Sequence, residues 1–171
     1  MKILGEKSLS SKVIIGLNIL FTIISFIDIL VLSIIIKTLS HIFMNENIQN
    51  NMFDLMFFII VIITGIVALV IIYQFIKIFQ NLKNNILFCY DNSKRLNIVS
   101  NSCFILSSLY LIILIFLLLI MNKVIEEFIY YVFAFSIMLM VIFAVSGIGI
   151  KILCEIYKKS IEYKEENDFT I

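Results

Sequence analysis

The chain has 171 residues, of which 62% are hydrophobic and only 15% are charged, and its mean hydropathy is +1.12. Soluble domains are about half apolar and about a quarter charged, so this composition excludes a soluble globular domain and predicts an integral membrane protein. The formal net charge is only +1, so the distribution of the charges along the chain is more informative than their sum.

Four apolar runs predict four membrane-spanning helices, and therefore an all-α integral membrane bundle that forms a single domain. The runs cover residues 13–36, 55–76, 98–121 and 128–150. Each run reaches the roughly 20 residues that a helix needs to cross a hydrocarbon core about 30 Å thick. Proline is absent and glycine is scarce, which favours long uninterrupted helices. The basic start resembles the charged region of a signal peptide, but the first run is too long for one, so we expect a retained span.

Lysine and arginine predict the orientation of the chain in the membrane. Eleven of the thirteen cationic residues lie in the first twelve residues, in the central segment 77–97 and in the tail 151–171. The positive-inside rule therefore predicts an N-in, C-in topology in a cell membrane, with the central segment and the tail in the cytoplasm. The segment 38–54 would then form an outer loop.

The second and fourth runs end in similar sequence. Residues 76–82 and 150–156 both read I-K-I-[FL]-x-x-[LI], and mixed apolar and cationic residues follow in each case. This pattern is typical of helices that leave the bilayer and lie along its cytoplasmic surface. In a chain so rich in isoleucine and lysine, coincidence explains the repeat equally well.

Asp28 lies near the middle of the first run, where an ionised carboxylate is costly. At about 100° per residue, it shares a face about 140° wide with four other polar residues. These residues are Asn18, Thr22, Ser25 and Ser33. We expect this face to point toward other helices, where Asp28 is either a proton-responsive or ligand-binding group or a structural carboxyl. In the structural case it is neutral or hydrogen-bonded to a neighbouring span.

Other polar and small residues are expected to pack helices together. Side chains near the ends of the second and third runs predict interhelical hydrogen bonds worth about 1 kcal/mol or less each, and they are Tyr73, Gln74, Ser100, Asn101 and Ser102. Small side chains in the fourth run permit close packing, and they are Ala144, Ser146, Gly147 and Gly149. The basic segment 77–95 is either a topology signal alone or a binding site for anionic lipid or a cytoplasmic protein. Its scattered cations do not predict direct binding of nucleic acid.

No catalytic site, cofactor or metal is predicted. The sequence contains no paired nucleophile and base, no phosphate-binding glycine loop and no zinc motif. His41 has no potential co-ligand at metal-binding spacing. The three cysteines Cys89, Cys103 and Cys154 are odd in number and widely spaced, so we expect reduced thiols.

Two polar stretches resemble a known family. The first is Lys83–Cys89 followed by Asn92 and Lys94–Leu96, and the second is the tail Tyr163–Ile171. They are similar to the K-G-x-P-F-like, N-x-x-R-L-like and E-N-D-L-T-I-like elements of the bacterial four-span membrane family called domain of unknown function 2975. Asn and Leu replace the Gly and Pro of the first element, and Phe169 replaces the Leu of the tail.

The resemblance implies a membrane protein that tethers or controls a small cytoplasmic helix-turn-helix regulator. We therefore expect a non-enzymatic regulatory or sensor module in the lipid bilayer, whose spans sense a small or lipid-borne signal. The residues expected to contact the partner are Lys83, Phe88, Asn92, Lys94, Arg95, Leu96, Asn167, Asp168, Phe169, Thr170 and Ile171. Two alternatives are a self-immunity protein against a membrane-active peptide or bacteriocin and a small permease subunit.

Overall fold

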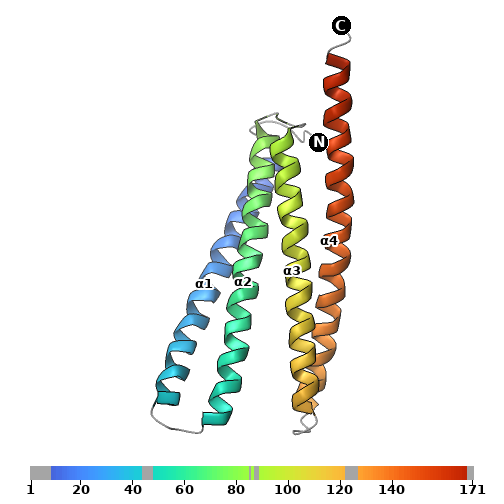
Figure 1. The fold of residues 1–171 in the computed structure, drawn as a ribbon. Coiled ribbons are helices and arrows are strands. Elements are labelled where there is room, and N and C mark those ends of the chain that lie inside the picture. Colours follow the sequence, from blue (N-terminus) through green and yellow to red (C-terminus); the bar gives the residue numbers. More distant parts are fainter. Residues whose placement is uncertain (1–8, 44–47, 85, 87–88, 122–126, 169–171) are drawn as a thin grey trace.

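The computed structural model describes residues 9–43, 48–84, 86, 89–121 and 127–168 (Figure 1). These residues form four helices, which are α1 (Leu9–Phe43), α2 (Ile48–Lys83), α3 (Tyr90–Met121) and α4 (Glu127–Asp168). Each helix contains a stretch long and apolar enough to cross a membrane. The prediction of an all-α membrane bundle with four spanning helices is confirmed.

The helices are longer than the apolar runs that predict them. The segment 38–54, expected to be a loop, is largely helical, because α1 continues to Phe43 and α2 begins at Ile48. The central segment 77–97 is also mostly helical, since α2 ends only at Lys83 and α3 begins at Tyr90. Hydropathy marks where side chains turn polar, whereas the backbone hydrogen bonds of a helix continue until a residue interrupts them. Both loop predictions were therefore too long.

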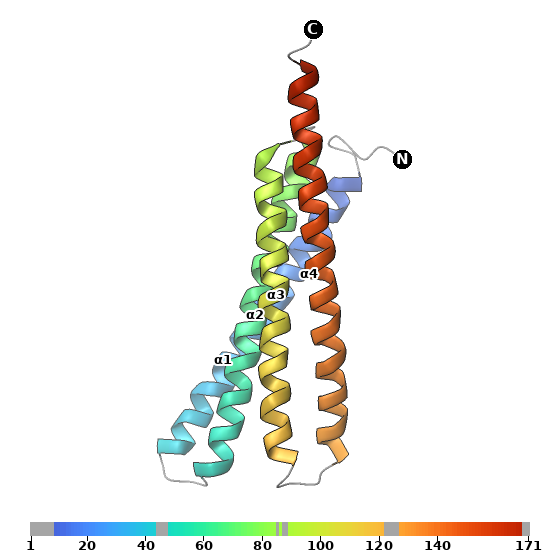
Figure 2. The ribbon, with the colours of Figure 1, turned by 45° about the vertical axis from the view of Figure 1, so that its right-hand side comes forward.

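The repeat at residues 150–156 predicted that the chain would bend there and lie along the membrane surface. Helix α4 shows no such bend. Its 42 residues form one continuous helix about 63 Å long, roughly twice the thickness of a hydrocarbon core. Figures 1 and 2 show its C-terminal part projecting past the ends of the other helices. The corresponding segment of α2 likewise continues the helix straight to Lys83. Surface-lying helices were thus the wrong prediction at both places.

The four helices pack in chain order. Helix α1 packs against α2, α2 against α3 and α3 against α4, and no other pair of these described helices is in contact. Figure 1 shows the C-terminal part of α1 beside α2, on the opposite side from α4, and Figure 2 shows that α1 slants relative to the other helices. We call the end where α1 and α3 begin and α2 and α4 end the polar end, and the opposite end the hairpin end. The result is an open row of helices in which α2 and α4 both lie on α3 without touching each other.

Candidate functional site

The polar end contains a hydrogen-bonded network that joins three helices. We call it the polar network, and its members are Gln74, Asn81, Asp91, Asn92, Arg95 and Tyr157. The α3 side chains come from the first two turns of that helix, directly after the connection from α2. We call residues 151–168 of α4, which follow its apolar run, the extension. The antiparallel arrangement of α2, α3 and α4 brings the last turns of α2 and the first part of the extension to the same level.

Asn92 lies at the centre of the polar network. Its side chain is only 1% exposed. Its Oδ1 accepts a hydrogen bond from Asn81 Nδ2 of α2 over 2.7 Å, and its Nδ2 donates to the Tyr157 hydroxyl of α4 over 3.2 Å. A single amide therefore connects α2 and α4, which have no direct packing contact.

Asp91 and Arg95 form the exposed side of the polar network. Arg95 Nε donates to Asp91 Oδ2 over 2.8 Å, and its second guanidinium nitrogen donates to Gln74 Oε1 of α2 over 3.2 Å. Asn81 also donates to Asp91 Oδ2 over 3.3 Å. The hydrogen bond from Arg95 lowers the pKa of the Asp91 carboxyl from its ordinary value. The ion pair of Asp91 and Arg95 thus remains charged in neutral solution, at the polar end of the bundle.

Helices α3 and α4 are fastened by further hydrogen bonds along their length. The buried Cys154 thiol donates to the Ser93 carbonyl oxygen over 3.2 Å. Ser100 donates to the Gly147 carbonyl oxygen over 2.8 Å, which confirms the expected interhelical role of this serine. Ser107 makes the same type of bond to Met140 over 3.1 Å. Interhelical hydrogen bonds therefore hold α3 and α4 together at three places along their contact.

Gly147 is the small residue that makes this close approach possible. A Cβ added to it would lie 3.2 Å from the Phe104 ring of α3, a tighter distance than nine in ten real Cβ contacts. A Cβ added to Gly149 would meet no atom within 4 Å. The expected close packing of the fourth span thus depends on Gly147 rather than on all its small residues.

The structure places the expected partner-binding residues in different environments. Asn92 is buried in the polar network, and Arg95 is half-buried within it. Lys83 and Leu96 are half-buried, whereas Lys94 and Asn167 are exposed. Asp168 is the last residue of α4. Phe88, Phe169, Thr170 and Ile171 lie outside the described residues. The N-x-x-R-L-like element thus contributes its Asn and Arg to helix packing, while its Lys faces outward.

The sequence did not single out Asn81, Asp91 or Tyr157 as site residues. Asn81 and Asp91 flank the short connection between α2 and α3, which is a local signal that sequence analysis can use. Tyr157 lies 65 residues from Asn92, and their contact depends on how α4 packs against α3. No sequence pattern identifies that contact.

The polar face predicted on α1 is only partly covered by the protein. Ser25 and Asp28 are half-buried against α2, whereas Asn18, Thr22 and Ser33 are exposed. The hydroxyls of Thr22, Ser25 and Ser33 donate to carbonyl oxygens of their own helix. The expectation that the whole face points toward other helices is therefore wrong, because α1 contacts α2 alone and one neighbour cannot cover so wide a face.

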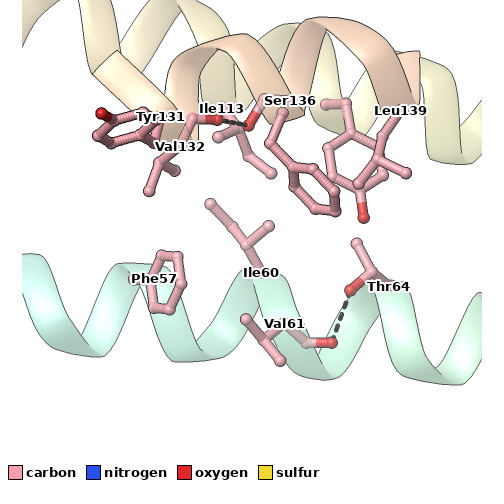
Figure 3. A pocket seen from close by; sticks show the side chains of 11 residues that line it. Phe57, Ile60, Val61, Thr64, Ile113, Tyr131, Val132, Ser136 and Leu139 are labelled. Carbon is pink, nitrogen blue, oxygen red and sulfur yellow. Dashed lines mark hydrogen bonds between the residues drawn. The ribbon is translucent and has the colours of Figure 1, made fainter. Parts of the chain in front are cut away.

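A cavity of about 570 Å³ opens between α2, α3 and α4, nearer the hairpin end. Figure 3 shows side chains of α2 facing side chains of α4 across it, among them Phe57, Ile60, Thr64, Val132, Ser136 and Leu139. Its lining is mostly apolar, and the hydroxyl-bearing residues in it are Thr64, Tyr110, Tyr131 and Ser136. The Thr64 hydroxyl donates to Val61 over 2.7 Å and the Ser136 hydroxyl to Val132 over 2.8 Å, so both bond to their own helices. The cavity exists because α2 and α4 lie apart on α3.

The cysteines and potential metal ligands add no further site. Cys89, Cys103 and Cys154 are free thiols, as expected, and the last two are buried. Among the described residues, no three histidine, cysteine or acidic side chains are grouped closely enough to hold a metal ion.

Comparison with known proteins places the chain in a family. No curated protein and no solved structure matches it. The family model described as "Protein of unknown function (DUF2975)" matches residues 39–171, which include all of α2, α3 and α4 and the whole polar network. Because the match covers well over half of the chain, this membrane protein belongs to the DUF2975 family.

Proposed function

We propose that the protein is a non-enzymatic regulatory module that holds a cytoplasmic partner at its polar end. In this proposal the chain crosses a cell membrane four times, with both termini in the cytoplasm. The observation that carries the proposal is the extension of α4, residues 151–168, whose C-terminal part projects past the ends of the other helices (Figure 1). A helix that only anchors a protein has no need of such an extension.

The extension presents apolar side chains among charges. Leu153, Ile156 and Tyr163 are 56%, 57% and 64% exposed. Lys151 and Glu155 are exposed on the same part of the helix. Exposed apolar residues at helical spacing, flanked by charges, are typical of helices that bind in a groove of another protein. This surface supports a protein partner for the part of α4 beyond the membrane.

The polar network offers a route from the membrane to that surface. It links the ends of α2 and α3 to Tyr157, which lies beside α3 in the N-terminal half of the extension. A shift of the spans in response to a small or lipid-borne signal would therefore move the extension. A second hydrogen bond, from the Tyr90 hydroxyl to Glu165 over 3.3 Å, couples the start of α3 to the distal part of the extension.

The family resemblance implies a small helix-turn-helix regulator as the partner. We propose that it contacts the exposed Lys94 and the chain end from Tyr163 to Ile171, with the buried Asn92 and the half-buried Arg95 positioning these segments.

The test is purification of the full-length protein from its native membranes in mild detergent, beside a chain truncated after Glu162. Mass spectrometry should identify a small DNA-binding protein with the full-length chain and not with the truncated one. A matched control exchanges Ile115, an exposed residue of α3 nearer the hairpin end, for alanine and should retain the partner. Recovery of no regulator, or equal recovery with the truncated chain, would contradict the proposal.

A second candidate function is self-protection against a membrane-active peptide. The apolar cavity between α2 and α4 supports it, because a groove of about 570 Å³ has the size of typical ligand pockets. In that case the chain truncated after Glu162 should still protect cells, since the cavity lies far from the tail.

A further inference from the structure

Between residues 13–36 of α1 and residues 57–72 of α2, the contact of the two helices contains one ionisable side chain, Asp28. The covered positions of α1 recur every three or four residues, as in a coiled coil, and include Phe21, Ile24, Asp28, Val31 and Ile35. Four of these five are large and apolar. Asp28 thus occupies a core position of this contact, in the middle of the span.

Gly65 of α2 provides the space for the Asp28 carboxyl. A Cβ added to Gly65 would lie 2.6 Å from Asp28 Cγ and closer still to Oδ1, so no larger residue fits there while the carboxyl keeps its place. The carboxyl therefore packs directly on the α2 backbone. Its Oδ2 is buried and has no hydrogen-bond partner among the described residues.

No charge near Asp28 compensates an ionised carboxylate. Residues 13–36 of the first run contain no other charged side chain, and residues 57–72 of α2 contain no titratable one. Among the described helices, α2 alone packs against α1. The nearest titratable groups on these two helices are Lys37 and Tyr73, each at least two helical turns away along the chain.

The contact between α1 and α2 also differs from the contact between α3 and α4 in its hydrogen bonds. Between residues 17 and 38 every hydroxyl of α1 bonds to its own helix, so none bonds to α2. The α3–α4 contact, by comparison, contains the interhelical bonds of Ser100, Ser107 and Cys154. In addition, the family match begins at residue 39, after most of α1. Over this part of the span, α1 depends on apolar packing and on the state of one carboxyl.

We propose that Asp28 and Gly65 form a proton-operated lock between α1 and α2. The neutral carboxyl packs on Gly65 and keeps α1 docked. Loss of the proton leaves a charge that needs water, and water reaches Asp28 only when α1 moves away from α2. This lock is independent of the partner at the polar end, so either proposal can fail without the other.

The sign and size of the effect follow from proton linkage. The docked form binds one proton more than the open form. The ratio of docked to open α1 therefore falls as the pH rises, by at most about tenfold per pH unit. Exchange of Asp28 for asparagine removes the proton and should abolish this dependence while keeping the size of the side chain.

Distances between spin labels test the lock in the full-length protein in lipid nanodiscs. Labels at Leu32 of α1 and Ile115 of α3, both about half exposed, report movement of α1. Labels at Ile115 and Val141 measure the distance between the hydrogen-bonded helices α3 and α4 as a control. The native cysteines Cys89, Cys103 and Cys154 are replaced by serine. Between about pH 5 and about pH 9, a range that includes the pKa values known for buried carboxyls, the first distance should lengthen and broaden. The control distance should stay fixed.

The outcomes separate the lock from general effects of pH. Asp28→Asn should keep the α1 distance short at both pH values. A wild-type distance that does not change, or an Asp28→Asn distance that changes as much, would overturn the proposal.

A geometric test uses no pH change. Gly65→Ala should open α1 at both pH values, and adding Asp28→Ala should close it again because the clash disappears. Failure of the second exchange to restore the short distance would also overturn the proposal.

Discussion

Replacing Asn92 by alanine removes the amide that joins α2 to α4 through the polar network. Two hydrogen bonds are lost, from Asn81 over 2.7 Å and to Tyr157 over 3.2 Å. Each contributes about 1 kcal/mol net to the free energy of unfolding. Asn81 and Tyr157 are half-buried, so both can turn to water and avoid the larger penalty of a buried unpaired group. We therefore expect a loss of about 2 kcal/mol, which corresponds to about 30-fold in the unfolding equilibrium.

The assay is reversible unfolding of the detergent-solubilised protein. Asn101→Ala is the matched control, because Asn101 lies on the same helix and its side chain is exposed. Tyr157→Phe removes only the hydroxyl and should cost about 1 kcal/mol. Combined with Asn92→Ala, it should add little, since the shared hydrogen bond is already lost. If Asn92→Ala destabilises the protein no more than Asn101→Ala, the polar network does not hold the helices together.

Two further predictions concern the α3–α4 contact and the exposed ion pair. Gly147→Val should push against the Phe104 ring and cost about 1–3 kcal/mol in unfolding free energy, whereas Gly149→Val should change it by less than about 0.5 kcal/mol. Equal losses in the two variants would refute the close-packing argument. Because Arg95 lowers the pKa of Asp91, their pair stabilises the fold above about pH 4, the ordinary value for a carboxyl. This stabilisation is lost as the pH falls through the lower pKa of the folded protein. Melting curves from pH 7 downward should show a small loss that is absent in Asp91→Asn, and an identical pH profile for both proteins would contradict it.

Local sequence was sufficient to predict four helices apolar enough to cross a membrane, but not where these helices end. The apolar run 98–121 and helix α3 both end at Met121, yet α3 begins eight residues before the run, at Tyr90. The difference between apolar run and helix is larger for α4, which continues 18 residues past the end of its run. The lipid selects side chains by polarity, but the helix itself is selected by backbone hydrogen bonding, which polar residues such as Lys158 and Glu162 also support.

Within the candidate site, local sequence likewise identified some residues, whereas the roles of others depend on how the helices pack. Asp28 was recognisable because a charge in an apolar run is unusual. Its partner Gly65 was not recognised, since its role depends on the register between α1 and α2. Asn92 was selected for a resemblance in sequence and expected at a binding surface, but the structure buries it between Asn81 and Tyr157.

The sequence by itself determined that this protein is embedded in lipid, how many spans it has and where in them its carboxyl lies. These properties depend on the polarity of consecutive residues, which can be read along the chain. Only the tertiary structure decided that α1 contacts α2 alone, that Gly65 accommodates Asp28 and that Asn92 connects α2 with α4. Apart from the polar face of α1, the spans are largely apolar on all sides, because lipid and neighbouring helices are equally apolar. No periodicity in the sequence therefore distinguishes the face that packs against protein from the face that contacts lipid.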